Sequence, residues 1–173
     1  MISDKMKNAL NEQIQLEGQA SSLYLSMSVW CDQKGLEGCA QFLRRQSEEE
    51  REHMLRIFDY MSEVDVMALT PGIQEPEHDF PSIQALFKRV YAHEQKVSNS
   101  IYRLLQIALE ENDYTTQHFL QWYVAEQKEE ENLMRSILDK INLIGEGPMT
   151  LYYIDKEVAA INLLEEAAEE EVE

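Results

Sequence analysis

Four long stretches of the chain repeat hydrophobic residues at the spacing of an amphipathic helix and contain few helix-breaking residues. They predict helices over residues 4–34, 36–64, 82–112 and 114–144. At the usual rise per residue, each helix would be about 45 Å long. Helices of this length and amphipathic pattern bury their apolar faces against one another, so the predicted fold class is all-α, a four-helix bundle.

The connections between these helices differ in length. Gly35 separates the first pair, and Asn112 with Asp113 separates the second pair, so each pair is expected to form an antiparallel hairpin. Residues 65–81 contain three prolines and are too long for a simple turn. This segment is therefore expected to be a long crossover between the second and third helices.

The C-terminal part is expected to form a short fifth helix. Gly145, Gly147 and Pro148 end the fourth helix, and Thr150 can cap the next one. That helix has one apolar stripe, formed by Leu151, Ile154, Val158 and Ile161. Residues 165–173 are Glu-rich and are expected to be a flexible acidic tail, which leaves a single domain over residues 1–164.

Each of the four long helices places one carboxylate on its apolar stripe. At 100° per residue, Glu17 falls about 20° from both Leu10 and Tyr24, at the centre of the stripe. The other three carboxylates lie within about 40° of the apolar residues of their own helices, and these are Glu50, Glu94 and Glu130. We therefore expect four carboxylates to point into the core.

The positions of the four carboxylates along the hairpins predict that they meet. Residues equidistant from a hairpin turn lie at one level, and Glu17 and Glu50 are almost equidistant from Gly35. Glu94 and Glu130 are equidistant from Asn112 in the same way. Each hairpin is thus expected to bring its two carboxylates together near the middle of the bundle.

Four carboxylates buried together need positive charge, because an uncompensated buried charge costs several kcal/mol. A buried salt-bridge network is the alternative without a metal, but the nearby stripe positions hold no Lys or Arg. His53 follows Glu50 by one helical turn on nearly the same face, and oxygen-rich ligation with one imidazole suits iron or manganese. Glu75 and His78 have the same spacing but lie in the crossover, where we expect an exposed loop.

The charge balance favours cations as partners. The chain has 33 acidic and 15 basic residues, a formal net charge of −18, which repels nucleic acid and anionic lipid. The first ten residues are polar and no stretch is long and apolar enough for a membrane span, so a cytoplasmic protein is expected. Cys31 and Cys39 are expected to be buried hydrophobic residues rather than a disulfide or a metal site.

At these residues the chain resembles the bacterial non-haem ferritins over nearly its whole length. The resemblance rests on four segments: NEQIQLEGQASSLY with Glu17 and Tyr24, FLRRQSEEEREHM with Glu49, Glu50 and His53, HEQ with Glu94, and FLQWYVAEQKEEE with Gln127 and Glu130. It implies a ferritin-like bundle, a cage of twenty-four identical subunits, and iron storage and detoxification. It also implies a ferroxidase that oxidises Fe(II) with dioxygen or peroxide and deposits hydrated ferric oxide in the cage.

The resemblance also implies roles for individual residues. Glu17 and His53 would hold one iron ion, Glu94 and Glu130 a second, and Glu50 would bridge the two. Tyr24 and Gln127 match residues close to this centre. A third iron site would use four ligands, namely Glu49, Glu126, Glu129 and the shared Glu130.

Three other functions remain as alternatives. A bacterioferritin would carry a second Glu-x-x-His on the fourth helix and a haem-binding methionine after the bridging glutamate, where this chain has Gln127-x-x-Glu130 and Arg51. The expected cofactor is therefore iron without haem. Di-iron oxygenases and reductases of related fold usually have two such histidine motifs as well. A metal-free acidic scaffold would require the inward carboxylates to be incidental.

Overall fold

The long helices form within two residues of the bounds that the sequence predicts. The computed structural model describes residues 2–170, and Met1 and residues 171–173 lie outside this range. The four long helices are α1 (Asp4–Gln33), α2 (Glu37–Glu63), α3 (Ile83–Glu110) and α4 (Tyr114–Ile144). The predicted all-α class is confirmed for the described residues, since five helices and no strand occur among them.

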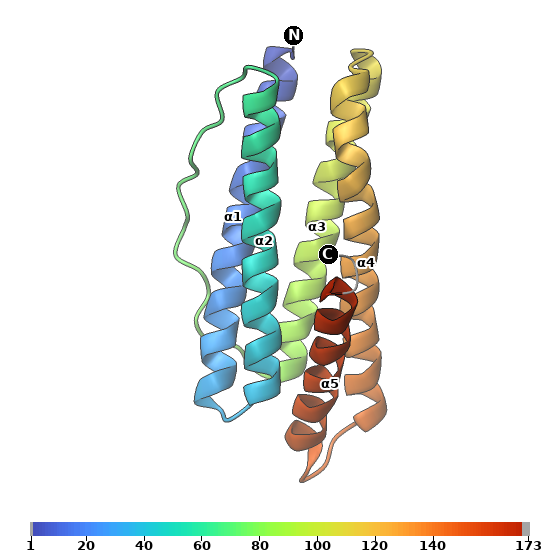
Figure 1. The fold of residues 1–173 in the computed structure, drawn as a ribbon. Helices are drawn as coiled ribbons and strands as arrows, with labels where there is room; N and C mark the ends of the chain where they lie inside the picture. Colours follow the sequence, from blue (N-terminus) through green and yellow to red (C-terminus); the bar gives the residue numbers. More distant parts are fainter. Residues whose placement is uncertain (1, 171–173) are drawn as a thin grey trace.

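The four helices form a bundle of two antiparallel hairpins (Figure 1). α1 packs mainly against α2, and α3 packs mainly against α4. The segment between α2 and α3 runs the length of the bundle along α1 and α2, so that α3 begins at the opposite end from where α2 stops (Figure 1). The predicted crossover is therefore confirmed, and it makes α2 and α3 parallel.

Gly18 of α1 explains how the crossover lies so close to the bundle. Glycine in a helix interior costs about 1 kcal/mol relative to alanine, so its presence needs a reason. A Cβ atom at this position would lie 2.9 Å from Cδ1 of Ile73 and 3.4 Å from Cγ of Pro71, both in the crossover. Gly18 thus leaves the room in which the crossover packs against α1.

The fifth helix is longer than the sequence predicts. α5 (Thr150–Glu170) continues six residues past the expected end at residue 164, because Glu and Ala favour helix even without an apolar stripe. It packs against α2 and α4. Of its predicted apolar stripe, Ile154 and Val158 are buried, whereas Leu151 is 51% exposed. Residues 171–173 of the predicted tail lie outside the described residues.

α5 is fixed to the start of α2 through an unusual cap. Leu36 occupies the N-cap position of α2 and cannot cap the helix with its side chain. Asp155 of α5 does so instead, because its carboxylate accepts hydrogen bonds from the backbone N–H groups of Gly38 (3.1 Å) and Cys39 (2.8 Å). The contact satisfies two N–H groups that would otherwise lack a partner at the helix start.

The core is divided into two apolar clusters by a polar layer at mid-height. One cluster uses residues 20–31 of α1 and 83–90 of α3, and the other uses residues 6–14 of α1 and 97–108 of α3. The layer between them contains Glu17 on α1 and Glu94 on α3. Such a layer lowers the stability of the fold unless its charges are paired or bind a metal.

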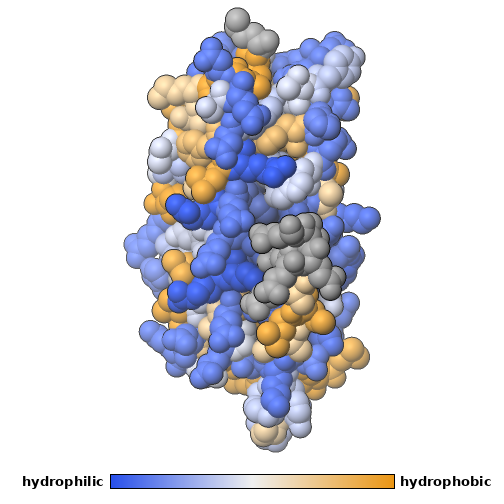
Figure 2. All heavy atoms as spheres, viewed as in Figure 1, coloured by the Kyte–Doolittle hydropathy of each residue, from blue (hydrophilic) through white to orange (hydrophobic). Residues whose placement is uncertain are grey.

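The surface is largely polar. Figure 2 shows a mainly hydrophilic face, with hydrophobic side chains gathered beside the lower part of α5. Between residues 143 and 153, where α4 ends and α5 begins, the exposed large side chains include Leu143, Met149, Tyr152 and Tyr153. Within residues 2–170, every helix is too short or too polar to cross a membrane.

Candidate metal centre

The polar layer brings together one carboxylate from each long helix. Their exposed fractions are 0% for Glu17, 1% for Glu50, 0% for Glu94 and 6% for Glu130. The predicted burial of all four is therefore confirmed. Buried glutamates are rare unless they are paired or bind a metal, so the layer requires a specific explanation.

Glu17, Glu50 and His53 form the tightest cluster. One ligand atom from each of them lies within 4.8 Å of the others, a spacing at which a single ion can contact all three. Nδ1 of His53 is 3.7 Å from Oε1 of Glu50, one helical turn away. The amide of Gln13 donates a hydrogen bond of 2.8 Å to Oε1 of Glu17 and so fixes that carboxylate.

Glu94 is held by two donors. The phenol of Tyr24 donates to its Oε1, and the amide of Gln127 donates to its Oε2 at 3.0 Å. The ring of Tyr24 lies edge-to-face with that of His93, with centroids 5.9 Å apart. Tyr24 and Gln127 thus lie where the sequence prediction places them, in direct contact with a proposed ligand.

Without a cation, the layer can exist only if protons replace the missing positive charge. Burial raises the pKa of Glu17 to about 7, although hydrogen bonds from Glu50 and Gln13 act in the opposite direction. The pKa of Glu50 and that of Glu130 are raised well above the usual range by burial and by the charge of Glu94.

His53 is prepared to act as a ligand at neutral pH. Burial and the charge of Arg56 lower its pKa to about 4, so the imidazole is neutral and has a free electron pair. The hydroxyl of Tyr123 donates a 2.6 Å hydrogen bond to the backbone carbonyl of His53, which fixes the helix at this point. The ring of Trp122 packs edge-to-face against the imidazole, with centroids 5.3 Å apart.

Several buried atoms of the layer have no hydrogen-bond partner among the described residues. Those on the proposed ligands are Oε2 of Glu17, Oε2 of Glu50, Oε2 of Glu130 and Nδ1 of His53, and the amide oxygens of Gln13 and Gln127 also lack a partner. A buried acceptor without a donor costs about 1–3 kcal/mol, and the four atoms on the proposed ligands are ligand atoms by type. The donor set of carboxylates and one imidazole fits iron or manganese, so the residues present fit the expected metal.

Three further glutamates line a cleft beside this layer. Glu49 of α2 and Glu126 and Glu129 of α4 border a cavity of about 850 Å³ that also reaches Glu130. Glu126 approaches His53 as well, with 3.9 Å between Oε1 and Nε2. The structure thus brings the residues predicted for a third iron site together around Glu130.

The other Glu-x-x-His pair is a surface feature, as the sequence predicts. The side chain of Glu75 is 84% exposed and that of His78 is 63% exposed, and the two interact at 3.1 Å. Ser26 of α1 and His78 lie within hydrogen-bonding distance, 3.0 Å. This pair binds the crossover to α1 and is far more exposed than Glu50 and His53.

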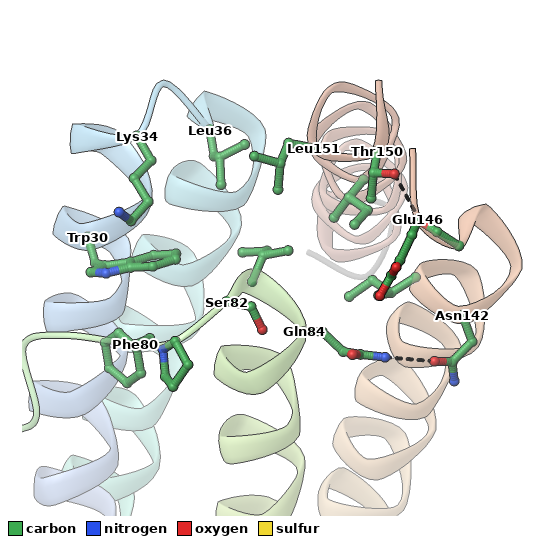
Figure 3. A pocket seen from close by; sticks show the side chains of 15 residues that line it. Trp30, Lys34, Leu36, Phe80, Ser82, Gln84, Asn142, Glu146, Thr150 and Leu151 are labelled. Carbon is green, nitrogen blue, oxygen red and sulfur yellow. Dashed lines mark hydrogen bonds between the residues drawn. The ribbon is translucent and has the colours of Figure 1, made fainter. Parts of the chain in front are cut away.

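A separate hollow of about 510 Å³ lies at the end of the bundle where α5 begins (Figure 3). Trp30 and Phe80 line one side of it, and a 2.9 Å hydrogen bond from Gln84 to Asn142 crosses another (Figure 3). None of the proposed metal ligands lines this hollow. It is therefore distinct from the polar layer.

The sequence analysis did not identify several residues that contact the proposed ligands, among them Gln13, Tyr123 and Arg45. Gln13 precedes Glu17 by four residues on the same helical face, so its spacing could have revealed it. The hydroxyl of Tyr123 on α4 acts across helices, on the backbone carbonyl of His53, whereas the guanidinium of Arg45 acts within α2, on Glu49 at 2.5 Å. Arg45 precedes Glu49 by four residues, but its second partner, Asn162 on α5, gives no sequence signal.

Comparisons with known proteins agree with this arrangement. A family model described as a ferritin-like domain matches residues 7–144. A bacterial non-heme ferritin of Escherichia coli O6:H1 is 42% identical over 162 residues, which cover 94% of this chain and 98% of the relative. The chain belongs to the ferritin family. The resemblance indicated by the sequence motifs is thereby confirmed.

Other ferritins match over similar lengths. A bacterial non-heme ferritin of Campylobacter jejuni is 42% identical over 163 residues, covering 94% of this chain and 98% of that one. The crystal structure of an open pore ferritin from Archaeoglobus fulgidus superimposes with a TM-score of 0.89 at 42% identity, covering 92% of this chain and 98% of that one. These likenesses confirm the ferritin-like bundle as the fold.

Proposed function

We propose that the protein stores and detoxifies iron as a ferroxidase, oxidising Fe(II) at the buried polar layer. The observation that carries the proposal is the cluster of Glu17, Glu50 and His53, with ligand atoms within 4.8 Å of one another and inside the bundle. Relatives that are 42% identical over nearly the whole chain are named non-heme ferritins, which supports iron as the metal.

The ligand set divides between two iron ions. Glu17 and His53 would hold the first, Glu94 and Glu130 the second, and Glu50 would bridge them. Support comes from the oxygen atoms of Glu17, Glu50 and Glu130 that lack hydrogen-bond partners among the described residues. Two divalent ions supply four positive charges, which match four ionised carboxylates.

The protein residues prepare the site for electron transfer to dioxygen. Carboxylates favour Fe(III) over Fe(II), so two Fe(II) substrate ions can each give one electron to dioxygen, which takes up two protons to form hydrogen peroxide. Tyr24 and Gln127 hold Glu94 in place, and Gln13 holds Glu17. The two apolar clusters above and below the layer exclude bulk water.

The accessory glutamates would form a third iron site that takes part in turnover. Glu49, Glu126 and Glu129 border one cleft with Glu130, a residue they would share with the di-iron pair. The charges of Glu49 and Glu126 contribute to the raised pKa of Glu130, so they lie close enough to act on it. A bound cation in the cleft would relieve that repulsion.

The oxidised iron would accumulate as hydrated ferric oxide inside a cage of twenty-four subunits in the cytoplasm. The exposed apolar side chains at the end of α4 and on α5, such as Leu143 (86% exposed), are suited to contacts between subunits. Electron microscopy of iron-loaded protein tests this part of the proposal. Hollow shells that fill with dense mineral are expected, whereas isolated subunits without mineral would favour an acidic scaffold.

Substitution of the ligands tests the ferroxidase directly. Glu50→Ala and His53→Ala should slow dioxygen-dependent Fe(II) oxidation at least roughly tenfold, because each removes a direct ligand. Stopped-flow absorbance after iron addition measures this rate, and size-exclusion chromatography checks that assembly persists. Glu52→Ala and His118→Ala remove the same side chains at exposed positions and serve as controls. Wild-type rates in Glu50→Ala and His53→Ala would refute the proposal.

A further inference from the structure

The cleft beside the polar layer has a third wall that the sequence prediction did not include. α2 contributes Arg45, Gln46 and Glu49, and α4 contributes five acidic or polar residues together with Leu133 and Lys140. The third wall comes from the C-terminal half of α5, through Ile161, Leu164, Glu165 and Ala168. Part of this wall belongs to the stretch that was expected to be a flexible tail. α5 therefore places an additional carboxylate, that of Glu165, at the accessory cleft.

Two buried oxygens at this cleft have no hydrogen-bond donor among the described residues. Gln46 is 1% exposed and Glu130 is 6% exposed, and both line the cleft. Oε1 of Gln46 and Oε2 of Glu130 have no hydrogen-bond partner among the described residues. The amide group of Gln46 donates to Glu49, which leaves its carbonyl oxygen available as a neutral ligand.

The guanidinium of Arg45 supplies a positive charge next to the carboxylate of Glu49 in the cleft. Its Nη1 lies 2.5 Å from Oε1 of Glu49, and its Nε donates a 2.8 Å hydrogen bond to Oδ1 of Asn162 on α5. Arg45 lines the same cleft as Glu130, the carboxylate shared with the proposed di-iron pair. A hydrogen-bonded chain from α5 through Arg45 thus holds Glu49 in its present position.

We propose that the cleft binds a hard divalent or trivalent cation, that Glu165 of α5 is one of its ligands, and that binding displaces Arg45. This inference rests on the proposed accessory iron site, which it extends to α5. Carboxylate and amide oxygens are the donors that hard cations prefer. A cation at Glu49 and a guanidinium at Glu49 repel each other, so the two compete for the same carboxylate.

This competition predicts that two substitutions change the cation affinity of the cleft in opposite directions. Glu165→Gln removes a ligand charge and should weaken cation binding in the cleft roughly tenfold. Arg45→Gln removes the competing charge and should tighten binding there roughly tenfold. The probe is Mn²⁺, which prefers oxygen ligands and whose free form is counted by electron paramagnetic resonance. Titration calorimetry on the assembled protein gives the two dissociation constants independently.

Charge-matched controls separate the cleft from the general surface. Asp139→Asn and Arg44→Gln change the charge by the same amounts at exposed positions outside the cleft, and should leave the titration unchanged. His53→Ala should abolish the tight step at the buried cluster and leave the cleft step in place. A His53→Ala titration identical to wild type would contradict the proposed di-iron site instead.

The titrations of Glu165→Gln and Arg45→Gln together decide whether the cleft binds a cation as proposed. Opposite shifts in Glu165→Gln and Arg45→Gln support the inference, and anomalous diffraction from Mn²⁺-soaked crystals should place an ion beside Glu165. Shifts of the same sign, or titrations of both variants that match those of the controls, overturn it. Size-exclusion chromatography of every variant confirms that the comparison is made on assembled protein.

Discussion

Replacing Glu17 with Gln should make the metal-free protein more stable and the metal-bound protein less stable. Burial raises the pKa of Glu17 from 4.5 to about 7. A group with a raised pKa in the folded state opposes folding by about 3 kcal/mol once the pH is above both pKa values. Gln has nearly the same shape and no charge to bury, so the variant avoids this cost.

The pH dependence of the difference follows from the same shift. Below about pH 4.5 Glu17 is protonated in both the folded and the unfolded chain, so Glu17→Gln should have little effect there. As the pH rises toward 7, the unfolded chain loses the proton while the folded chain retains it, and wild type loses stability relative to the variant. The free-energy difference should therefore grow across this window and reach about 3 kcal/mol at pH 7.5.

Guanidinium unfolding of metal-free protein at pH 4.5 and pH 7.5, with and without Mn²⁺, measures these differences. Mn²⁺ at one hundred times its dissociation constant stabilises a folded site by about 2.7 kcal/mol, and Glu17→Gln should lose most of this gain. Glu52→Gln is the exposed control on α2 and should show neither effect. A metal-free Glu17→Gln protein that is less stable than wild type at pH 7.5 would refute the electrostatic account.

Three further predictions concern the surroundings of the site. The double variant Glu49→Ala/Glu129→Ala should keep rapid two-iron oxidation but change the number of Fe(II) ions oxidised per dioxygen, as oximetry would show; an unchanged ratio assigns these residues to the surface. The purified protein should be free of haem, because Arg51 cannot supply a thioether ligand, and a stoichiometric Soret band would contradict this. Gly38→Ala should displace α5, because its Cβ would lie 2.4 Å from the carbonyl oxygen of Asp155; hydrogen exchange should then accelerate in α5 and not in α3.

The four long helices and their inward carboxylates could be predicted because both depend on local spacing. An amphipathic stripe fixes which face of a helix is buried, and Glu17 and Glu94 lie on that face by simple periodicity. Distance from the hairpin turns then predicted which carboxylates meet. None of these steps required knowledge of contacts between distant parts of the chain.

The position and length of α5 could not be predicted in the same way. Its contacts join residues more than one hundred positions apart, such as Asp155 with Gly38 and Arg45 with Asn162. When another helix supplies the cap, the sequence at the start of the capped helix contains no capping residue. At the start of α2 the N-cap residue is Leu36, which cannot cap the helix with its side chain. The Glu-rich sequence after residue 164 is compatible with both a helix and a solvated tail, so the end of α5 could not be predicted from it.

Diffraction at the iron absorption edge tests the central claim most directly. Crystals of the assembled protein would be soaked with Fe(II) under anaerobic conditions, and anomalous difference maps would locate the metal. The account predicts two iron peaks inside the bundle, one contacting Glu17 and His53 and the other contacting Glu94 and Glu130, with Glu50 between them. Iron confined to the protein surface, with the buried layer free of anomalous density at saturating Fe(II), would contradict it.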